Sequence, residues 1–235
     1  HSPAVSGPLR AAGGACAGAG IRAGRMGLIV DAALSEALDA WTGNARLDLA
    51  DAGYDAARFA RLTGRIDFDG GTKGTRGTAR LAANRFAMPQ AAGTGLGLDG
   101  DYRFGAGAMR FVGKARASEV RLADSQLAAI RGFGATGQGT PVGPLAAALA
   151  QALEKAGRGV ALDAAFQLDQ RGDAGALTVT RLAGLGADGA TITLGEGRGV
   201  RLAWPGSAMR IDAVLALSGG GLPEGRVSLR QAAPG

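Results

Sequence analysis

Apolar residues recur at every second position in short runs along most of this chain. In GRIDFDGG, residues 64–71, Ile66 and Phe68 alternate with charged residues. Successive side chains of a β-strand point to opposite faces, so a run of this kind has one apolar face and one polar face. Gly, Asp and Asn separate the runs, which favours turns between antiparallel strands. The pattern therefore predicts an antiparallel meander with one face in water and one face that needs a cover.

The alternation falls into two meanders, over residues 44–131 and over residues 160–231. Together they are long enough for about a dozen strands of ordinary length. Residues 1–27 are rich in Gly and Ala and show little period. We expect the whole chain, residues 1–235, to be a single segment of a mainly β structure.

One or two short amphipathic helices are expected to interrupt this sheet. Over residues 141–157, Pro144 suits a first helical turn, Gly157 provides a stop, and three leucines recur with a spacing of four. The leucines of this stripe are Leu145, Leu149 and Leu153. The stretch LIVDAALSEALDAW, residues 28–41, also has apolar residues at helical spacing, although its first three residues suit a strand.

Composition does not decide what covers the apolar face of the predicted sheet. The chain is 46% hydrophobic, but aromatic residues make up only 5% and 42 of the 235 residues are glycine. Few large side chains are therefore available to fill a core between two sheets. Two architectures remain: a closed sandwich or solenoid filled by its own side chains, or an open groove filled by an apolar ligand.

Residue types that commonly carry catalysis or bind metals are scarce. His1 is the only histidine and Cys16 the only cysteine, which excludes a Ser-His-Asp triad, a histidine metal site and an internal disulfide within this sequence. GLGLDG, residues 95–100, matches a dinucleotide-binding pattern, but DYRF follows it where a helix is required. We therefore expect no enzyme, no cofactor and no metal site.

The charged residues predict a solvated face. The formal net charge is +6, and the basic residues stand singly between apolar ones without interleaved aromatics, so we expect no nucleic-acid partner. Two carboxylate pairs, Asp67 with Asp69 and Asp99 with Asp101, have a spacing that points both side chains the same way. Calcium requires six or more oxygens, so a solvated strand face explains these pairs better than a cation site.

Three stretches of the sequence resemble the YdbH-type members of the AsmA-like superfamily. They are RFARLTGRIDFDGG (58–71), the stretch from GTPVGPLA to FQLDQ (139–170), and RLAWPG with LALSGGGLPEGRVSLRQAAPG (201–206 and 215–235). The resemblance covers most of residues 44–235 and rests on the order of helix, WPG turn and GGGLPE turn, with no catalytic signature. Proteins of this family are intermembrane phospholipid transport proteins of Gram-negative bacteria.

The resemblance implies a fold, a location and partners. Family members are anchored in the inner membrane by an N-terminal segment and cross the periplasm as an extended, curled antiparallel β-sheet that forms a hydrophobic groove. Phospholipid acyl chains move along the groove towards the outer membrane, where a small lipoprotein is a candidate partner. By this resemblance the chain is an internal segment of such a bridge and lacks the anchor.

The predicted groove lining is the inward member of each alternation. The alternative is a closed β-sandwich or solenoid domain of a large secreted or surface protein, in which the same residues would form a core. The predicted lining residues are Leu47, Leu49, Ile66, Phe68, Leu81, Leu96, Leu98, Tyr102, Phe104, Met109, Phe111, Val120, Leu122, Phe166, Leu168, Leu177, Val179, Ile192, Leu194, Val200, Leu202, Ile211 and Leu215.

Overall fold

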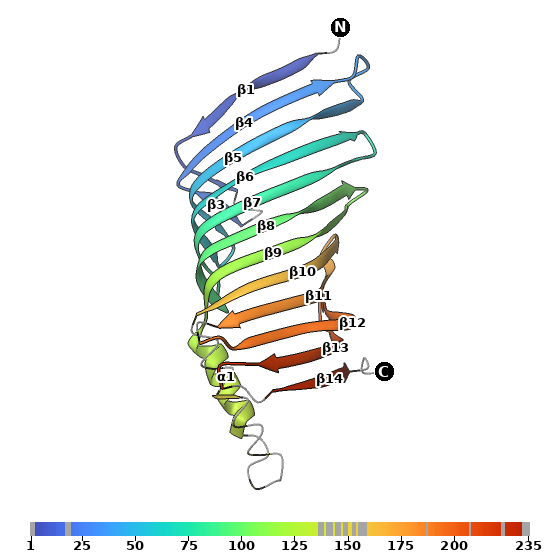
Figure 1. Cartoon of the computed structure of the whole chain (residues 1–235). Coiled ribbons are helices and arrows are strands. Elements are labelled where there is room, and N and C mark those ends of the chain that lie inside the picture. The colour runs from blue at the N-terminus through green and yellow to red at the C-terminus, as the bar shows by residue number, and fades with distance from the viewer. Residues whose placement is uncertain are drawn as a thin grey trace.

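The computed structural model is one large antiparallel sheet with a helix at its side (Figure 1). It describes residues 3–16, 20–135, 159–186, 188–206, 208–221 and 224–231, and the single positions 139, 143, 147, 150, 151 and 154. The first strands are β1 (Ala4–Ala11), β2 (Gly14–Cys16), β3 (Ile21–Ala23), β4 (Arg25–Leu34), β5 (Ala40–Tyr54), β6 (Ala57–Gly71), β7 (Gly74–Ala87), β8 (Ala91–Gly105) and β9 (Ala108–Leu122). After helix α1 (Asp124–Ala135) follow β10 (Val160–Arg171), β11 (Ala174–Gly186), β12 (Thr191–Trp204), β13 (Ala208–Ser218) and β14 (Gly225–Gln231).

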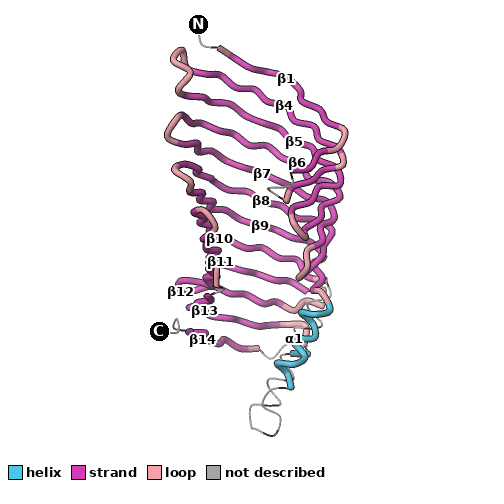
Figure 2. The backbone as a smooth tube through the Cα atoms, turned by 180° about the vertical axis from the view of Figure 1, so that it is seen from behind, coloured by secondary structure: helices cyan, strands magenta, loops and turns pink. Residues whose placement is uncertain are grey.

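The sheet has 14 strands, and from β4 to β14 each strand hydrogen-bonds to the next along the chain. The order is β1-β4-β5-β6-β7-β8-β9-β10-β11-β12-β13-β14, and the β2–β3 hairpin joins this path through β5. Strands β1 and β14 are the two edges, so the described sheet does not close on itself. Seen from the front and from behind, the strands bend along their length and the sheet curls (Figures 1 and 2). The prediction of a mainly β, curled antiparallel sheet is confirmed.

The predicted helix over residues 28–41 is wrong. Residues 28–34 belong to β4, and β5 begins at Ala40. Leu28 and Val30 pair with Leu47 and Ala45 of β5, so their spacing of two places both on the apolar face of the sheet. The stretch has apolar residues at both helical and strand spacing, and cross-strand pairing decides between them because helix propensity is a weak preference.

The connection between β9 and β10 becomes helical earlier in the chain than the sequence predicted. Helix α1 occupies residues 124–135, although residues 44–131 were expected to form sheet throughout. Within residues 141–157, the five described positions are all helical. The predicted stripe of Leu145, Leu149 and Leu153 lies outside the described residues. Arg131 of α1 forms an ion pair with Glu154 at 3.8 Å, which places this second helical stretch beside α1.

The sheet has almost no closed core. Among the described residues the buried hydrophobic side chains are mostly alanines, and no large side chain is fully buried. The accessible surface of the chain is 14503 Å², whereas a compact monomer of 23.3 kDa exposes about 9,700 Å² by the scaling of area with mass. Most of the sheet is therefore a single layer with both faces accessible.

Candidate functional site

The pairing register of the strands defines one apolar face. Side chains directly opposite each other on paired strands lie on the same face of the sheet, so a chain of paired residues can be followed across it. One such row crosses the sheet at its centre and contains no charged residue. It consists of Leu47, Gly64, Leu81, Leu98, Ala115, Ala164, Leu182, Leu194 and Leu215.

Three further rows run parallel to this one on the same face. Together the four rows make up what we call the apolar face. The row of Leu49 contains Leu62, Ala83, Leu96, Ala117, Leu162, Gly184 and Ile192; that of Ile66 contains Ala79, Gly100, Gly113, Phe166, Val179, Val200 and Ile211; that of Phe68 contains Gly77, Tyr102, Phe111, Leu168, Leu177 and Leu202.

The structure brings the predicted lining residues together on this face. Phe104 and Met109 pair with each other two residues beyond Tyr102 and Phe111, which stand in the row of Phe68. Val120 lies opposite Val160, two residues from Leu162, because β9 contains one extra residue at this point relative to β10. Leu122, two residues further along, follows Val120 on the same strand. The remaining predicted lining residues all stand in the four rows.

Charge is excluded from the apolar face. Between Met26 of β4 and Val227 of β14, none of the described residues paired on this face is charged. The polar residues paired on this face are Thr75, Tyr102, Gln170 and Gln231, and all four lie towards the same rim of the sheet. An acyl chain or another apolar body lying along the rows would meet no buried charge.

Aromatic rings lie across glycines of the neighbouring strands. A Cβ placed on Gly100 would come within 2.8 Å of the ring of Phe111, and one placed on Gly113 within 2.6 Å of the same ring. Phe111 also stacks on Phe166, with ring centroids 5.7 Å apart and an interplanar angle of 19°. Trp41 lies over Gly70 in the same manner, because a Cβ placed on Gly70 would come within 2.8 Å of Nε1 of Trp41. The rings therefore lie flat on the sheet and leave a level floor.

Glycine positions also show which face is the inner one. At Gly113 on the apolar face, a Cβ would overlap the carbonyl oxygen of Asp99 on the adjacent strand, and at Gly77 it would overlap that of Asp67. On the opposite face, a Cβ at Gly27 or Gly97 would keep 3.6 and 4.0 Å from the nearest atoms. In their middle parts, neighbouring strands thus approach each other on the apolar side and spread on the polar side, whereas close approaches on the polar side occur at strand ends, at Gly71 and Gly105. This is the geometry of a sheet curled towards its apolar face.

The inner face remains accessible. Phe104 retains 58% of its surface and Leu202 retains 41%, whereas Phe111, near the middle of the sheet, retains 8%. No second sheet covers the rows among the described residues. An uncovered apolar face of this kind marks the candidate binding surface.

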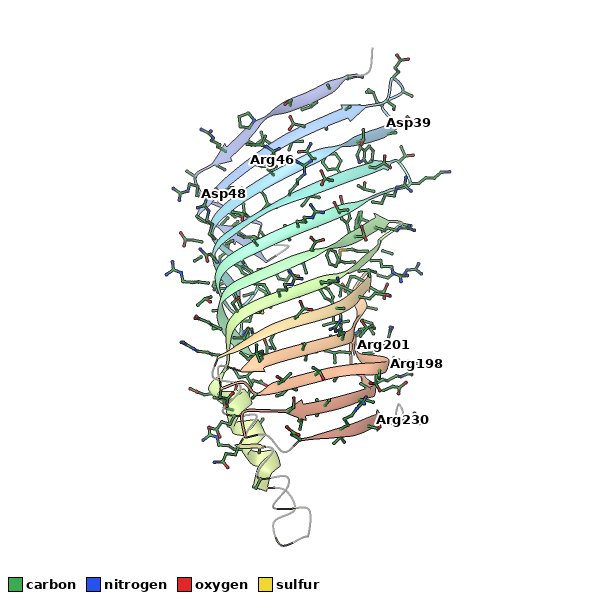
Figure 3. All side chains as sticks on the ribbon, in the orientation of Figure 1. Asp39, Arg46, Asp48, Arg198, Arg201 and Arg230 are labelled. Carbon is green, nitrogen blue, oxygen red and sulfur yellow. The ribbon has the colours of Figure 1, made fainter. Side chains whose placement is uncertain are left out.

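The outer face is polar and carries ion pairs along the whole sheet. Charged side chains from β5 to β14 are distributed over it, among them Arg46, Asp48, Arg201 and Arg230 (Figure 3). The cross-strand or same-strand ion pairs are Arg61–Asp48, Arg65–Asp67, Arg76–Asp69, Arg80–Asp99, Arg110–Asp169, Arg116–Asp163, Arg226–Glu196 and Arg230–Asp212.

Carboxylates singled out in the sequence are engaged in these pairs. Asp67, Asp69 and Asp99 each face an arginine, and the described residues contain no group of three His, Cys, Asp or Glu arranged to hold a metal ion. Hydrogen bonds from Arg61 lower the pKa of Asp48, and hydrogen bonds from Arg65 lower the pKa of Asp67. Burial raises the pKa of Tyr102, with a further contribution from the nearby Asp67 charge.

A line of bent residues was missed from the sequence. Asp51, Arg85 and Glu119 have positive φ angles of 51°, 47° and 50° and lie at the same level of β5, β7 and β9. Past this line the buried side chains on the three strands are those of Ala52, Phe86 and Val120. In the sequence, each of these three residues follows two adjacent residues that are small or polar. The alternation of apolar and polar residues therefore shifts by one position there, and this shift was the signal that could have predicted the bends. The bends carry the apolar face around the curled side of the sheet.

Comparisons with known protein families, with curated proteins and with solved structures found no match for this chain. Among the described residues, no helix is both long enough and apolar enough to cross a membrane.

Proposed function

We propose that the apolar face binds the acyl chains of phospholipids, and that this chain is a groove segment of a periplasmic bridge carrying phospholipids between the inner and outer membranes. The observation that carries the proposal is a continuous, accessible and uncharged face that crosses the sheet from β4 to β14. The resemblance to YdbH-type proteins supports the periplasmic location, an inner-membrane anchor in the parent protein and a small outer-membrane lipoprotein as a partner. The proposed activity is binding and transfer, without catalysis.

The hydrophobic effect is sufficient to hold a lipid on such a face. Transfer of each methylene group out of water contributes roughly 0.8 kcal/mol. An acyl chain therefore needs no strong polar contact with the groove. The headgroup stays in water at the open side.

The form of the lining suits a ligand that moves along it. A deep pocket would hold the lipid at one place, whereas similar neighbouring sites allow it to slide. Rings lying flat over glycines, as Phe111 lies over Gly100 and Gly113, keep the floor level. Leucine and alanine fill most of the remaining positions in the four rows, so adjacent sites differ little in depth.

The closed sandwich or solenoid alternative requires the chain to fill the apolar face with its own side chains. The described residues form a single open sheet, and its large inner side chains keep part of their surface accessible. The groove is therefore the function that the geometry supports better.

Site-specific photo-crosslinking tests the proposal. A photo-reactive amino acid at Phe68 or Phe166, on the apolar face, is expected to capture phospholipid in cells or from vesicles. The same group at Asp67 or Arg110, on the outer face, is the matched control and is expected to capture none. Equal capture from the two faces would contradict the proposal.

A functional test uses charge at the same positions. Phe68→Asp or Phe166→Asp in the full-length parent should block lipid transfer while the protein still accumulates, because a sliding acyl chain would meet a desolvation barrier of several kcal/mol. Degradation of both variants before transfer can be measured would favour a closed core over an open groove.

A further inference from the structure

The cations of the outer face fall into two groups. Six arginines of β6, β7 and β9 face a carboxylate in the ion pairs above. Lys73, Arg103, Arg171 and Arg201 differ, because none of them forms an ion pair or a side-chain hydrogen bond with any residue in the described part of the chain. All four are exposed. Unpaired cations close together repel one another, so their grouping needs an explanation.

These four cations line one depression at the rim of the sheet. Its volume is about 690 Å³, and it lies where the turns between β6 and β7, β8 and β9, and β10 and β11 meet. Arg110 and its partner Asp169 complete the charged lining, so five cations face a single carboxylate. The β8–β9 and β10–β11 turns are joined by a hydrogen bond of 3.3 Å that Gly172 N donates to Gly107 O.

Two other depressions on the outer face are close to neutral. The one between β7 and β10 is lined by three cations, Arg80, Lys114 and Arg116, and by two carboxylates, Asp99 and Asp101. A third, near β4 and β5, also has three cations and two carboxylates in its lining. The excess of four positive charges is thus a property of the rim depression.

The same depression includes the outermost residues of the apolar face. Phe104, Met109 and Trp204 line it together with the cations. Phe104 pairs with Met109, and Trp204 lies over Gly175 of the adjacent strand. Phe104 is 58% exposed although it belongs to the apolar face. An apolar surface and an unpaired positive charge therefore meet at this rim.

We propose that the rim depression binds the phosphate of an anionic lipid headgroup while the acyl chains of the same molecule lie on the adjacent apolar face. This inference rests on the proposed function and assigns the headgroup to one rim of the groove. Arginine and lysine form charge-assisted hydrogen bonds with phosphate oxygens, which are stronger than those between neutral groups. Because the four cations have no carboxylate partner to displace, a phosphate gains their full attraction.

Calorimetric titration of the purified chain with three probes tests the inference. The probes are dihexanoyl phosphatidylglycerol, which is anionic, dihexanoylglycerol, which has the same chains without charge, and inorganic phosphate. In Arg103→Gln/Arg201→Gln, the affinity for the anionic lipid is expected to fall about tenfold at low salt, as the loss of charge-assisted contacts implies. The affinity for dihexanoylglycerol is expected to stay the same.

The matched control removes two charges elsewhere. Arg46→Gln/Arg121→Gln changes the net charge equally at two exposed cations that do not line the depression, and it should leave all affinities unchanged. An equal loss in this control, or an equal loss for the neutral lipid in the rim variant, would overturn the inference. Inorganic phosphate binding as tightly as the lipid would identify a site for free anions and overturn it as well.

The neutral probe separates this inference from the proposed function. If the wild-type chain binds dihexanoylglycerol but does not prefer the anionic lipid, the acyl groove stands and the headgroup site is wrong. If it binds neither lipid, the groove itself is wrong.

Discussion

The two halves of the sheet present the same apolar face through different pairings. From β4 to β9 every strand pairs with the next without a register shift, and β5, β6, β8 and β9 are each 15 residues long. From β9 to β13 each pairing contains a register shift. The uncharged face nevertheless continues from one half into the other.

The bulges of the second half preserve the face where the spacing of apolar residues is irregular. Val179 and Leu182 are three residues apart, which would place them on opposite faces of a regular strand. In the structure they pair with Phe166 and Ala164, so Thr180 and Arg181 together oppose a single residue. The comparison shows that the same apolar face is kept in both halves of the sheet. The pairing register varies between the halves in a way that keeps apolar residues on that face.

Single deletions should break the two halves to very different degrees. Deleting Arg80, on the outer face of β7 in the regular half, moves every later residue of that strand by one position and exchanges the faces of Leu81 and Ala83. We expect this variant to lose its cooperative thermal unfolding transition. Deleting Thr180 removes one of the two residues that oppose Ala165 and makes the pairing of β10 with β11 regular. This deletion should lower the free energy of unfolding by only about 1 kcal/mol.

Circular dichroism melting of the two deletion variants measures this difference. Similar melting curves for both would mean that register in the first half is not fixed by its apolar face.

A charge at the junction of the halves should have the next largest effect. Phe111 of β9 is 8% exposed and stacks on Phe166 of β10, where the regular half meets the bulged half. Phe111→Asp is expected to lower the free energy of unfolding by about 4 kcal/mol, because it removes a buried ring and places a charge on the apolar face. Val112→Asp, at the next position on the outer face, where Val112 is 44% exposed, should cost about 1 kcal/mol or less.

Urea denaturation of both variants provides the measurement. A comparable loss in Phe111→Asp and Val112→Asp would show that the two faces are equally solvated.

The face could be predicted from the sequence because it depends only on period two. Ile66 and Phe68 share a face in any strand that contains both, whichever strand lies next to it. Pairing partners, strand lengths and bulges depend on contacts between distant segments, which a local pattern does not contain. Residues 28–41 illustrate the limit: their helical spacing is real, but pairing of β4 with β5 across ten positions overrides it.

The candidate headgroup site was hidden from the sequence for a related reason. Lys73, Arg103, Arg171 and Arg201 stand singly in four different parts of the chain, so they appear as ordinary exposed charges. Only the pairing of the strands and the meeting of their turns at one rim bring them together. A meander places every second turn on the same side, which is the one clue that the sequence offered.

The bends of the regular half should respond modestly to substitution. Glu119 has a φ of 50°, a conformation that costs a residue with a side chain roughly 1 kcal/mol or more and costs glycine little. Glu119→Gly is therefore expected to raise the free energy of unfolding by up to about 1 kcal/mol, and Glu119→Val to lower it by a similar amount. Both changes are measured by thermal melting, and stabilisation by valine would contradict the observed backbone conformation.

The smallest expected effect is a pH dependence that belongs to the regular half. Hydrogen bonds from Arg61 and Arg65 lower the pKa of Asp48 and of Asp67 in the folded state. A carboxyl group with a lowered folded pKa contributes stability that is present above its unfolded value of about 3.9 and is lost as pH falls through the folded value. Both aspartates are exposed, so the contribution is small and is screened by salt.

Melting temperatures between pH 6 and pH 2.5, a range chosen to span the ordinary carboxyl pKa of about 3.9, test this expectation. In Asp48→Asn/Asp67→Asn the fall of stability towards acid should be shallower than in the wild type, since the groups that must take up protons are gone. Arg61→Gln/Arg65→Gln should also make the fall of the melting temperature towards acid shallower, because the aspartates then titrate alike in the folded and unfolded states. An acid limb as steep as that of the wild type in both variants would assign the acid sensitivity to other carboxylates and leave the ion pairs of the first half without a measurable role.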